Sequence, residues 1–319
     1  MIPTVDKRPA TGGGARSRVT SAGRHTWAAI AARPAVAVGV GILVVLGVVA
    51  MLAPLIEPYP ANRRVGQVFN SPSSSHWLGL DDGGADVFSV LIGGARVSLL
   101  TGFGSAFVAT LIGVSLGVVA GYQGGIADGI IMRVTDYFLV IPTLPLTIVM
   151  SALWKSGTGH TIVIIGALLW PWSTRIVRAQ VTSTRERLHV IRARAMGASR
   201  RRILVHHVVP QLVGLVIASA VITLASAVFL ETALDFLGLG DSNVVSWGTM
   251  LENAFQRDAV SAGAWWVVLP PGLIITVTIV ACYLVGEGVE LAVGLRGQLN
   301  YLIGGARTAG AVEPASIAE

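Results

Sequence analysis

The sequence predicts an all-α polytopic membrane protein with about six transmembrane helices, and three observations indicate this fold. The mean hydropathy is +0.70 and only 13% of the 319 residues are charged, so one soluble core cannot bury the apolar side chains. The apolar residues gather into stretches near the roughly 20 residues with which a helix crosses about 30 Å of hydrocarbon. The basic residues mostly lie in the gaps between these stretches.

Six apolar stretches are candidate spans, each bounded by Gly, Pro or charge: 35–56, 97–121, 129–153, 161–179, 208–230 and 265–288. The first is too long for a signal-peptide core and follows too long a leader, which favours an uncleaved span. The fourth is the weakest, because its apolar part ends near Trp172 and it continues through Arg175 and Arg178, whose long side chains can reach the headgroups. A five-span alternative stays open.

The spans divide the chain into three regions. A flexible tail is expected at 1–33, a membrane domain at 34–296 and a second tail at 297–319. Within the membrane domain we expect an outer loop, a large internal loop and an outer re-entrant segment: 57–95, 180–207 and 231–264.

The basic residues predict the orientation of the chain. The first tail, the stretch from Arg175 to Arg202 and the region after the last span hold six, nine and two Lys or Arg residues, whereas the opposite side holds four. Because cytoplasmic loops carry the excess of Lys and Arg, both termini are predicted to be cytoplasmic.

The internal loop predicts a short helix. Ser183 and Glu186 have capping-box spacing, and Gly197 suits the left-handed position that ends a helix. The i, i+3, i+7 spacing places three residues on one face: Leu188, Ile191 and Ala195. A helix of about 13 residues would be about 20 Å long. It could dock a partner or lie on anionic lipid, where each base contributes about 1 kcal/mol. Ser199 is expected to cap a second short helix.

Gly113, Gly117 and Gly121 recur every fourth residue in the second span, which predicts close packing of another helix backbone. Arg133 and Asp136 have i, i+3 spacing, and a structural ion pair is favoured over a proton relay.

Glu231 and Asp235 follow the fifth predicted span at i, i+4 spacing. They face either the entrance of a pathway or the aqueous loop, and the sequence leaves both alternatives open.

Several function classes are disfavoured. Cys282 is the only cysteine, so neither a disulfide framework nor a CxxC metal site is expected. The bases form no continuous face for nucleic acid. Neither lysine, Lys7 or Lys155, follows glycine as a Walker loop requires, so ATP must be hydrolysed elsewhere. His206 and His207 are adjacent and so cannot ligate one metal as an i, i+4 pair would.

Several sequence blocks resemble a known family. HVIRARAMGASRRRILVHHVVP resembles the EAA loop of ABC importer permeases, with a glycine four residues after Ala193 and a proline 13 beyond Gly197. Further blocks are similar to the C-type permease subunits of dipeptide and oligopeptide importers: HWLGLDDGGADVFSVLIGGARVSLLTG, AGYQGGIAD, MRVTDYFLVIP, FLETALDFLGLG and SWGTML. The resemblance runs from about His76 to about Arg296.

The resemblance implies a type I ABC importer transmembrane domain with a cytoplasmic coupling helix, in the inner (plasma) membrane of a prokaryote. It implies a heterodimer with a homologous permease, two ATP-binding subunits, an external substrate-binding protein and membrane lipid, with no nucleic acid. The chain itself would be no enzyme and would bind no cofactor, because ATP and Mg belong to the ATPase subunits. The implied coupling residues are Glu186, Leu188, Ile191, Arg192, Ala193, Arg194, Ala195, Met196 and Gly197.

The sequence departs from the family pattern in two places. Ile191 and Arg192 stand where the family usually has Glu followed by Ala, so we expect docking to use apolar and basic groups against an acidic groove of the ATPase. The Asp82–Asp86 segment also differs, which affects the contacts of the outer loop. Dipeptides or oligopeptides are the expected cargo. The alternatives are nickel or haem as cargo, a proton-coupled carrier, or a membrane-anchored interaction protein.

Overall fold

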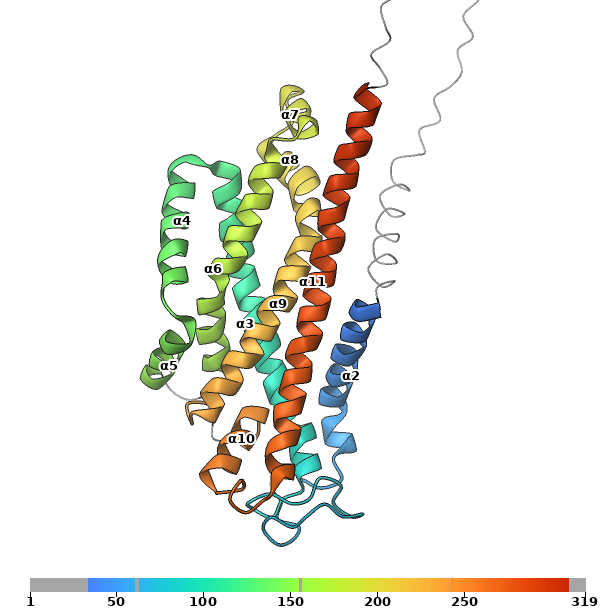
Figure 1. Cartoon of the computed structure of the whole chain (residues 1–319). Coiled ribbons are helices and arrows are strands. Elements are labelled where there is room, and N and C mark those ends of the chain that lie inside the picture. Colours follow the sequence, from blue (N-terminus) through green and yellow to red (C-terminus); the bar gives the residue numbers. More distant parts are fainter. Residues whose placement is uncertain (1–33, 61–62, 155–156, 242, 310–319) are drawn as a thin grey trace, which may run out of the picture.

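The computed structural model describes residues 34–60, 63–154, 157–241 and 243–309, which form a bundle of helices (Figure 1). The predicted tail at 1–33 lies outside the described residues. Five helices are long and apolar enough to cross a membrane: α2 (Pro34–Ile56), α3 (Val87–Gln123), α6 (Thr158–Arg185), the continuous run Arg200–Phe236 that ends in α9 (Val209–Phe236), and the Trp265–Leu291 part of α11 (Trp265–Ala309). The all-helical membrane fold is confirmed.

Three short helices mark the ends of the bundle. We call the end that carries α7 (Leu188–Ala195) and α8 (Arg200–Ile203) the α7 end, and the opposite end, with α10 (Trp247–Gln256), the α10 end (Figure 1). Of the 231–264 segment, residues up to Phe236 are the last turns of α9, so only α10 forms a separate helix there.

The third predicted span is broken, whereas the sequence suggested one continuous helix. It consists of α4 (Gly125–Val140) and α5 (Thr143–Leu153), which meet at an angle of 90°. The break falls at Ile141, whose backbone is extended (φ −75°, ψ 126°), immediately before Pro142. Proline disfavours helical backbone at the residue before it and lacks the N–H that would continue the helix. The number of spans is therefore five, or six if this pair is one span.

The fourth predicted span is a long helix that is apolar enough to cross a membrane. α6 continues past Arg175 and Arg178 to Arg185. Arg178 donates two hydrogen bonds of 2.6 Å to Asp128 of α4, and Arg175 donates one of 2.5 Å to Asp136. These bases are thus neutralised by a neighbouring helix, where the sequence suggested that their side chains extend to the headgroups. Arg133 forms no ion pair with Asp136 among the described residues.

The second span begins ten residues earlier than its apolar pattern indicated. Asp86 caps α3, because its Oδ2 accepts hydrogen bonds from the N–H and the hydroxyl of Ser89 at 2.9 and 2.8 Å. Residues 87–95 therefore belong to the span, and the connecting loop is shorter than the predicted 57–95.

The three predicted packing glycines line a seam between α3 and α6. A Cβ on Gly113 would lie 2.6 Å from Cβ of Ser173, and one on Gly117 would lie 2.8 Å from the carbonyl oxygen of Thr174. A Cβ on Gly121 would lie 2.8 Å from the carbonyl oxygen of Arg178. Only glycine allows this approach of the two backbones.

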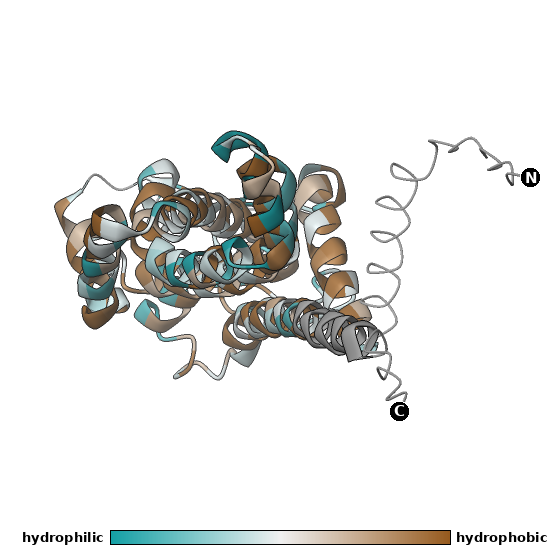
Figure 2. Cartoon of the chain, turned by 90° about the horizontal axis from the view of Figure 1, so that it is seen from above, coloured by the Kyte–Doolittle hydropathy of each residue, from teal (hydrophilic) through white to brown (hydrophobic). Residues whose placement is uncertain are grey.

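The outer faces of the bundle are apolar. Large apolar side chains remain exposed on α2, α3 and α4, among them Met51, Phe107 and Ile126. The view along the bundle in Figure 2 shows hydrophobic residues over the outward faces of the helices. Such a surface suits lipid or neighbouring membrane subunits.

Candidate functional site

Helix α7 is seated on the bundle by one narrow apolar face. Val190 and Ala193 are buried, and Val190 packs in a cluster with Val177 and Val181 of α6 and with Leu212 of α9. The helix therefore contacts both of the spans that it connects. A displacement of α7 must push on at least one of them, because packed side chains transmit strain.

The opposite face of α7 is free in this chain. Leu188 is 70% exposed and Met196 81% exposed, and Ile191 lies between them on the surface. The basic residues Arg192 and Arg194 are exposed as well. Apolar side chains surrounded by arginines have the composition of a protein-binding surface, in which a few apolar anchors and Arg dominate.

The ends of α7 differ from those that the sequence suggested. Ser183 lies in the last turns of α6, where Arg185 is the last helical residue, so it begins no new helix. Arg187 is the N-cap residue of α7 and has no side-chain capping bond. The helix has 8 residues, or about 12 Å, in place of the expected 13 or so. Glu186 thus lies outside α7, exposed in the connection from α6.

The C-terminal end of α7 has the expected conformation. Gly197 has φ +82°, and the N–H of Ala198 donates to the carbonyl of Ala193 at 3.0 Å, as in a Schellman ending. Ser199 then caps α8 by accepting from the N–H of Arg202 at 3.3 Å. A π-helical turn, Leu204–Val208, joins α8 to α9 without a break.

The α7 end is strongly basic. A cavity of about 1050 Å³ lies between the α3–α4 connection and α7, and three arginines line it together with Glu186: Arg185, Arg194 and Arg200. Arg185 is fixed by donating to the carbonyls of Gly121 and Tyr122 at 3.1 and 3.3 Å.

His189 of α7 is also embedded in this basic end. Burial lowers its pKa, and His207 and Arg187 lower it further. These surroundings therefore favour the neutral form of the histidine over its charged form.

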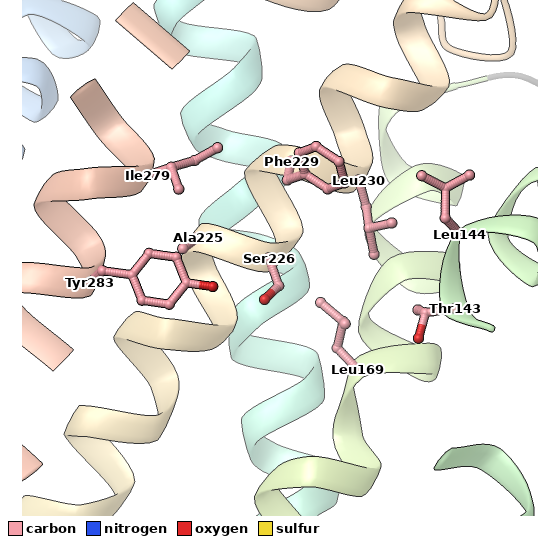
Figure 3. A pocket seen from close by; sticks show the side chains of 9 residues that line it. All are labelled: Thr143, Leu144, Leu169, Ala225, Ser226, Phe229, Leu230, Ile279 and Tyr283. Carbon is pink, nitrogen blue, oxygen red and sulfur yellow. The ribbon is translucent and has the colours of Figure 1, made fainter. Parts of the chain in front are cut away.

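A second feature is a pair of cavities in the middle of the bundle. They have volumes of about 390 and 400 Å³ and share Leu169 of α6, Ser226 of α9 and Tyr283 of α11 as lining residues. Figure 3 shows Tyr283 reaching toward the part of α9 that carries Ser226, with Leu169 and the α5 residue Thr143 across the space. Neither cavity was visible in the sequence pattern, because the walls of one come from four helices and those of the other from three.

A third feature is a buried polar network at the α10 end. Glu231 is 1% exposed and accepts a hydrogen bond of 3.0 Å from the hydroxyl of Ser98. The same Ser98 oxygen accepts from the N–H of Trp247 at 3.1 Å, and Asp235 accepts from the hydroxyl of Ser246. Both carboxyl groups lie inside the protein and attach α10 to α3 and α9. The aqueous-loop alternative for Glu231 and Asp235 is therefore wrong.

The loop between α2 and α3 is also attached through polar and charged side chains. Asp82 pairs with Arg257 at 2.8 Å, and Asp86 pairs with Nδ1 of His76 at 2.9 Å. These are the contacts made by the segment in which the sequence departs from the family pattern. Within the described residues no group of three His, Cys, Asp or Glu side chains is placed to hold a metal ion.

Comparisons with known proteins agree on one family. Residues 113–293 match the family described as binding-protein-dependent transport system inner membrane component. The chain is 35% identical over 254 residues to the dipeptide transport system permease protein DppC of Bacillus subtilis (strain 168), covering 79% of both proteins. It is 32% identical over 255 residues to the oligopeptide transport system permease protein OppC of the same organism, covering 79% of this chain and 83% of that one.

Two further matches are a curated permease protein and a solved structure. The glutathione transport system permease protein GsiD of Pectobacterium atrosepticum is 34% identical over 262 residues, covering 81% of this chain and 86% of that one. A solved structure titled inward facing conformations of the MetNI methionine ABC transporter aligns with a TM-score of 0.49 at 19% identity, covering 65% of this chain and 95% of that chain. From the family match and the relatives above 30% identity, the chain belongs to the binding-protein-dependent transport system inner membrane components, as a multi-pass permease subunit.

Proposed function

We propose that this chain is a permease subunit of an ATP-driven type I importer for dipeptides and oligopeptides, and that α7 is its coupling helix. The relatives support the peptide cargo, since those above are named for dipeptide, oligopeptide and glutathione transport. The observation that carries the coupling role is the geometry of α7, which has a buried seat on two spans and an exposed apolar and basic face.

The proposed assembly has a homologous permease as second half, two ATP-binding subunits at the α7 end and a substrate-binding protein at the α10 end. The α7 end is then cytoplasmic, which agrees with the excess of arginine there. ATP and Mg²⁺ would be bound by the partner ATPase subunits, and this chain would do no chemistry. Closure of the ATPase pair would move α7, and α6 and α9 would follow.

An assembly experiment tests the coupling role. Ile191→Asp places a charge on the exposed face of α7 and should abolish co-purification of the ATPase subunits and ATP-dependent uptake of a labelled dipeptide. Trp77→Asp, at a more exposed apolar residue (69% against 47%) of the loop at the other end, should leave co-purification intact. Normal assembly and uptake with Ile191→Asp would refute the proposal.

The charge of the α7 face suggests the chemistry of its partner. Arg192 and Arg194 are both exposed there, so an acidic groove on the ATPase would complement them. Arg192→Glu together with Arg194→Glu should weaken assembly, and the loss should be greater at low salt. Unchanged ATPase stimulation would show that the groove is not acidic.

The structure does not support the ion pair on which the proton-coupled carrier alternative was based. That alternative relied on Arg133 and Asp136 as a membrane charge pair, but Asp136 pairs with Arg175 of α6. Uptake that stops on ATP depletion and persists after collapse of the proton gradient would separate the importer from a carrier.

A further inference from the structure

The two central cavities form one groove through the middle of the membrane domain. They share three lining residues, and along α9 their walls extend from Leu215 to Leu230, the central part of the Arg200–Phe236 span. Four helices contribute to the walls, α5, α6, α9 and α11 (Figure 3). The groove therefore lies where hydrocarbon would surround the protein.

The groove is lined by hydroxyl groups and apolar side chains. Its hydroxyls belong to residues from three helices, α5, α9 and α11: Thr143, Ser219, Thr223, Ser226 and Tyr283. The only carboxylate or basic side chain among its lining residues is Glu290 of α11, seven residues beyond Tyr283 toward the α7 end. The centre of the groove thus has hydrogen-bonding groups without formal charge.

Two of these hydroxyls face the space shared by both cavities. Tyr283 is 50% exposed, and the described residues offer its hydroxyl no hydrogen-bond partner. Ser226 donates only a long bond of 3.4 Å to the carbonyl of Ile222. By contrast, Ser219 is engaged with Ser173 at 3.1 Å. Ser226 and Tyr283 are therefore the two hydroxyl groups that line both cavities and remain available to a bound molecule.

We propose that this groove is one wall of the peptide path and that Ser226 and Tyr283 bind the peptide main chain. This inference rests on the proposed function. A hydroxyl donates and accepts, so it can satisfy either the N–H or the C=O of a peptide group. A peptide group left unpaired at this depth would weaken binding, because no water is there to replace the missing hydrogen bond. A wall without formal charge neither traps nor repels a charged side chain, so the groove accepts peptides of varied sequence.

Cysteine labelling in the complete transporter tests whether the groove is the path. The single native cysteine is fully buried, so Cys282→Ala supplies a background without thiols in this chain. Ser226→Cys and Tyr283→Cys in that background should react with a small charged methanethiosulfonate, and a transported dipeptide should slow the reaction. Ser74→Cys, at an exposed position in the loop between α2 and α3 and outside the groove, is the control and should react without protection by the dipeptide.

The labelling result separates this inference from the proposed function. If neither groove position reacts, or if the dipeptide does not protect them, while ATP-dependent dipeptide uptake is normal, the groove is filled by the second permease or by lipid and the inference is wrong. If the Cys282→Ala background shows no ATP-dependent uptake of any peptide although the complex assembles, the proposed function is what fails.

Kinetics test the role of the hydroxyls. Tyr283→Phe and Ser226→Ala should each raise the KM for a dipeptide by about two- to tenfold, the value of one hydrogen bond, with little change in kcat. Ser226→Thr keeps the hydroxyl and should restore the KM. An unchanged KM in both hydroxyl-deleted variants would exclude main-chain binding at these residues.

Discussion

Ser98 joins three helices through two hydrogen bonds, and its removal should be costly. The hydroxyl donates to Glu231 of α9 and accepts from the N–H of Trp247, the first residue of α10. A first-turn N–H has no partner within its own helix, so Ser98 is the group that satisfies it. Ser98→Ala therefore leaves two buried polar groups unpaired. At about 1–3 kcal/mol for each, the free energy of unfolding should fall by about 2–6 kcal/mol.

The same helix supplies a matched control. Ser105 lies two turns along α3 and is also fully buried, but its Oγ has no hydrogen-bond partner among the described residues. Ser105→Ala should leave stability unchanged or raise it slightly. Unfolding of both variants in mixed micelles with increasing SDS, followed by tryptophan fluorescence, gives the two free energies. Equal losses for Ser98→Ala and Ser105→Ala would refute the bridging role of Ser98.

Three further predictions follow from the packing and the charges. Gly117→Ala should destabilise the fold by about 1–3 kcal/mol in the same assay, because the new Cβ would lie 2.8 Å from a carbonyl oxygen of α6. Gly41→Ala, whose Cβ would have nothing within 4 Å, should be neutral or stabilising. Equal effects of the two substitutions would contradict the close packing of α3 on α6 at Gly117. Asp136→Asn should lower the free energy of unfolding by only about 0–1 kcal/mol, because the Asp136–Arg175 pair is exposed. Asp128→Asn should lower it more, because two charged hydrogen bonds to Arg178 are lost. The reverse order of the two losses would be inconsistent with the structure. Burial raises the pKa of Asp81, so the folded protein binds a proton at this carboxyl group more tightly than the unfolded chain does. The resulting contribution to the free energy of unfolding is present below the ordinary pKa of 3.8 and is lost as the pH rises through the raised pKa. Asp81→Asn should therefore raise Tm near neutral pH and lose this advantage in acid, and a Tm that falls equally at both pH values would exclude the desolvation.

The sequence predicted the spans wherever long apolar runs were clear. It placed the first and last spans well, since hydropathy alone decides them. It placed the start of the second span too late, because polar and apolar residues alternate irregularly after the capping residue Asp86. The backbone hydrogen bonds of α3 begin at this cap, whatever the hydropathy of the residues that follow. The break at Pro142 had a local signal, the proline itself, but the apolar run continues across it and concealed the bend.

The misjudged charges share one cause. Arg178 and Asp128 are 50 residues apart, and Arg175 and Asp136 are 39 apart, so periodicity within one helix could not reveal their pairing. In the same way, the capping-box spacing of Ser183 and Glu186 is a local signal, which the continuing hydrogen-bond ladder of α6 overrides. The exposed face of α7 was foreseen in its residues, because an amphipathic pattern assigns faces even when the helix ends are wrong.

The π-helical turn at Leu204–Val208 fixes the direction in which α7 faces. Such a turn is wider than an α-helical turn and holds a surplus residue. Deleting that surplus residue would rotate α8, and with it the end of α7 to which it is joined, by about 100° around the axis of α9, the angle of one residue in a regular helix. The direction in which the exposed arginines of α7 point therefore depends on one additional residue in the π-helical turn. A permease without this residue would carry the same apolar and basic side chains on α7 but would turn them away from the partner that they bind.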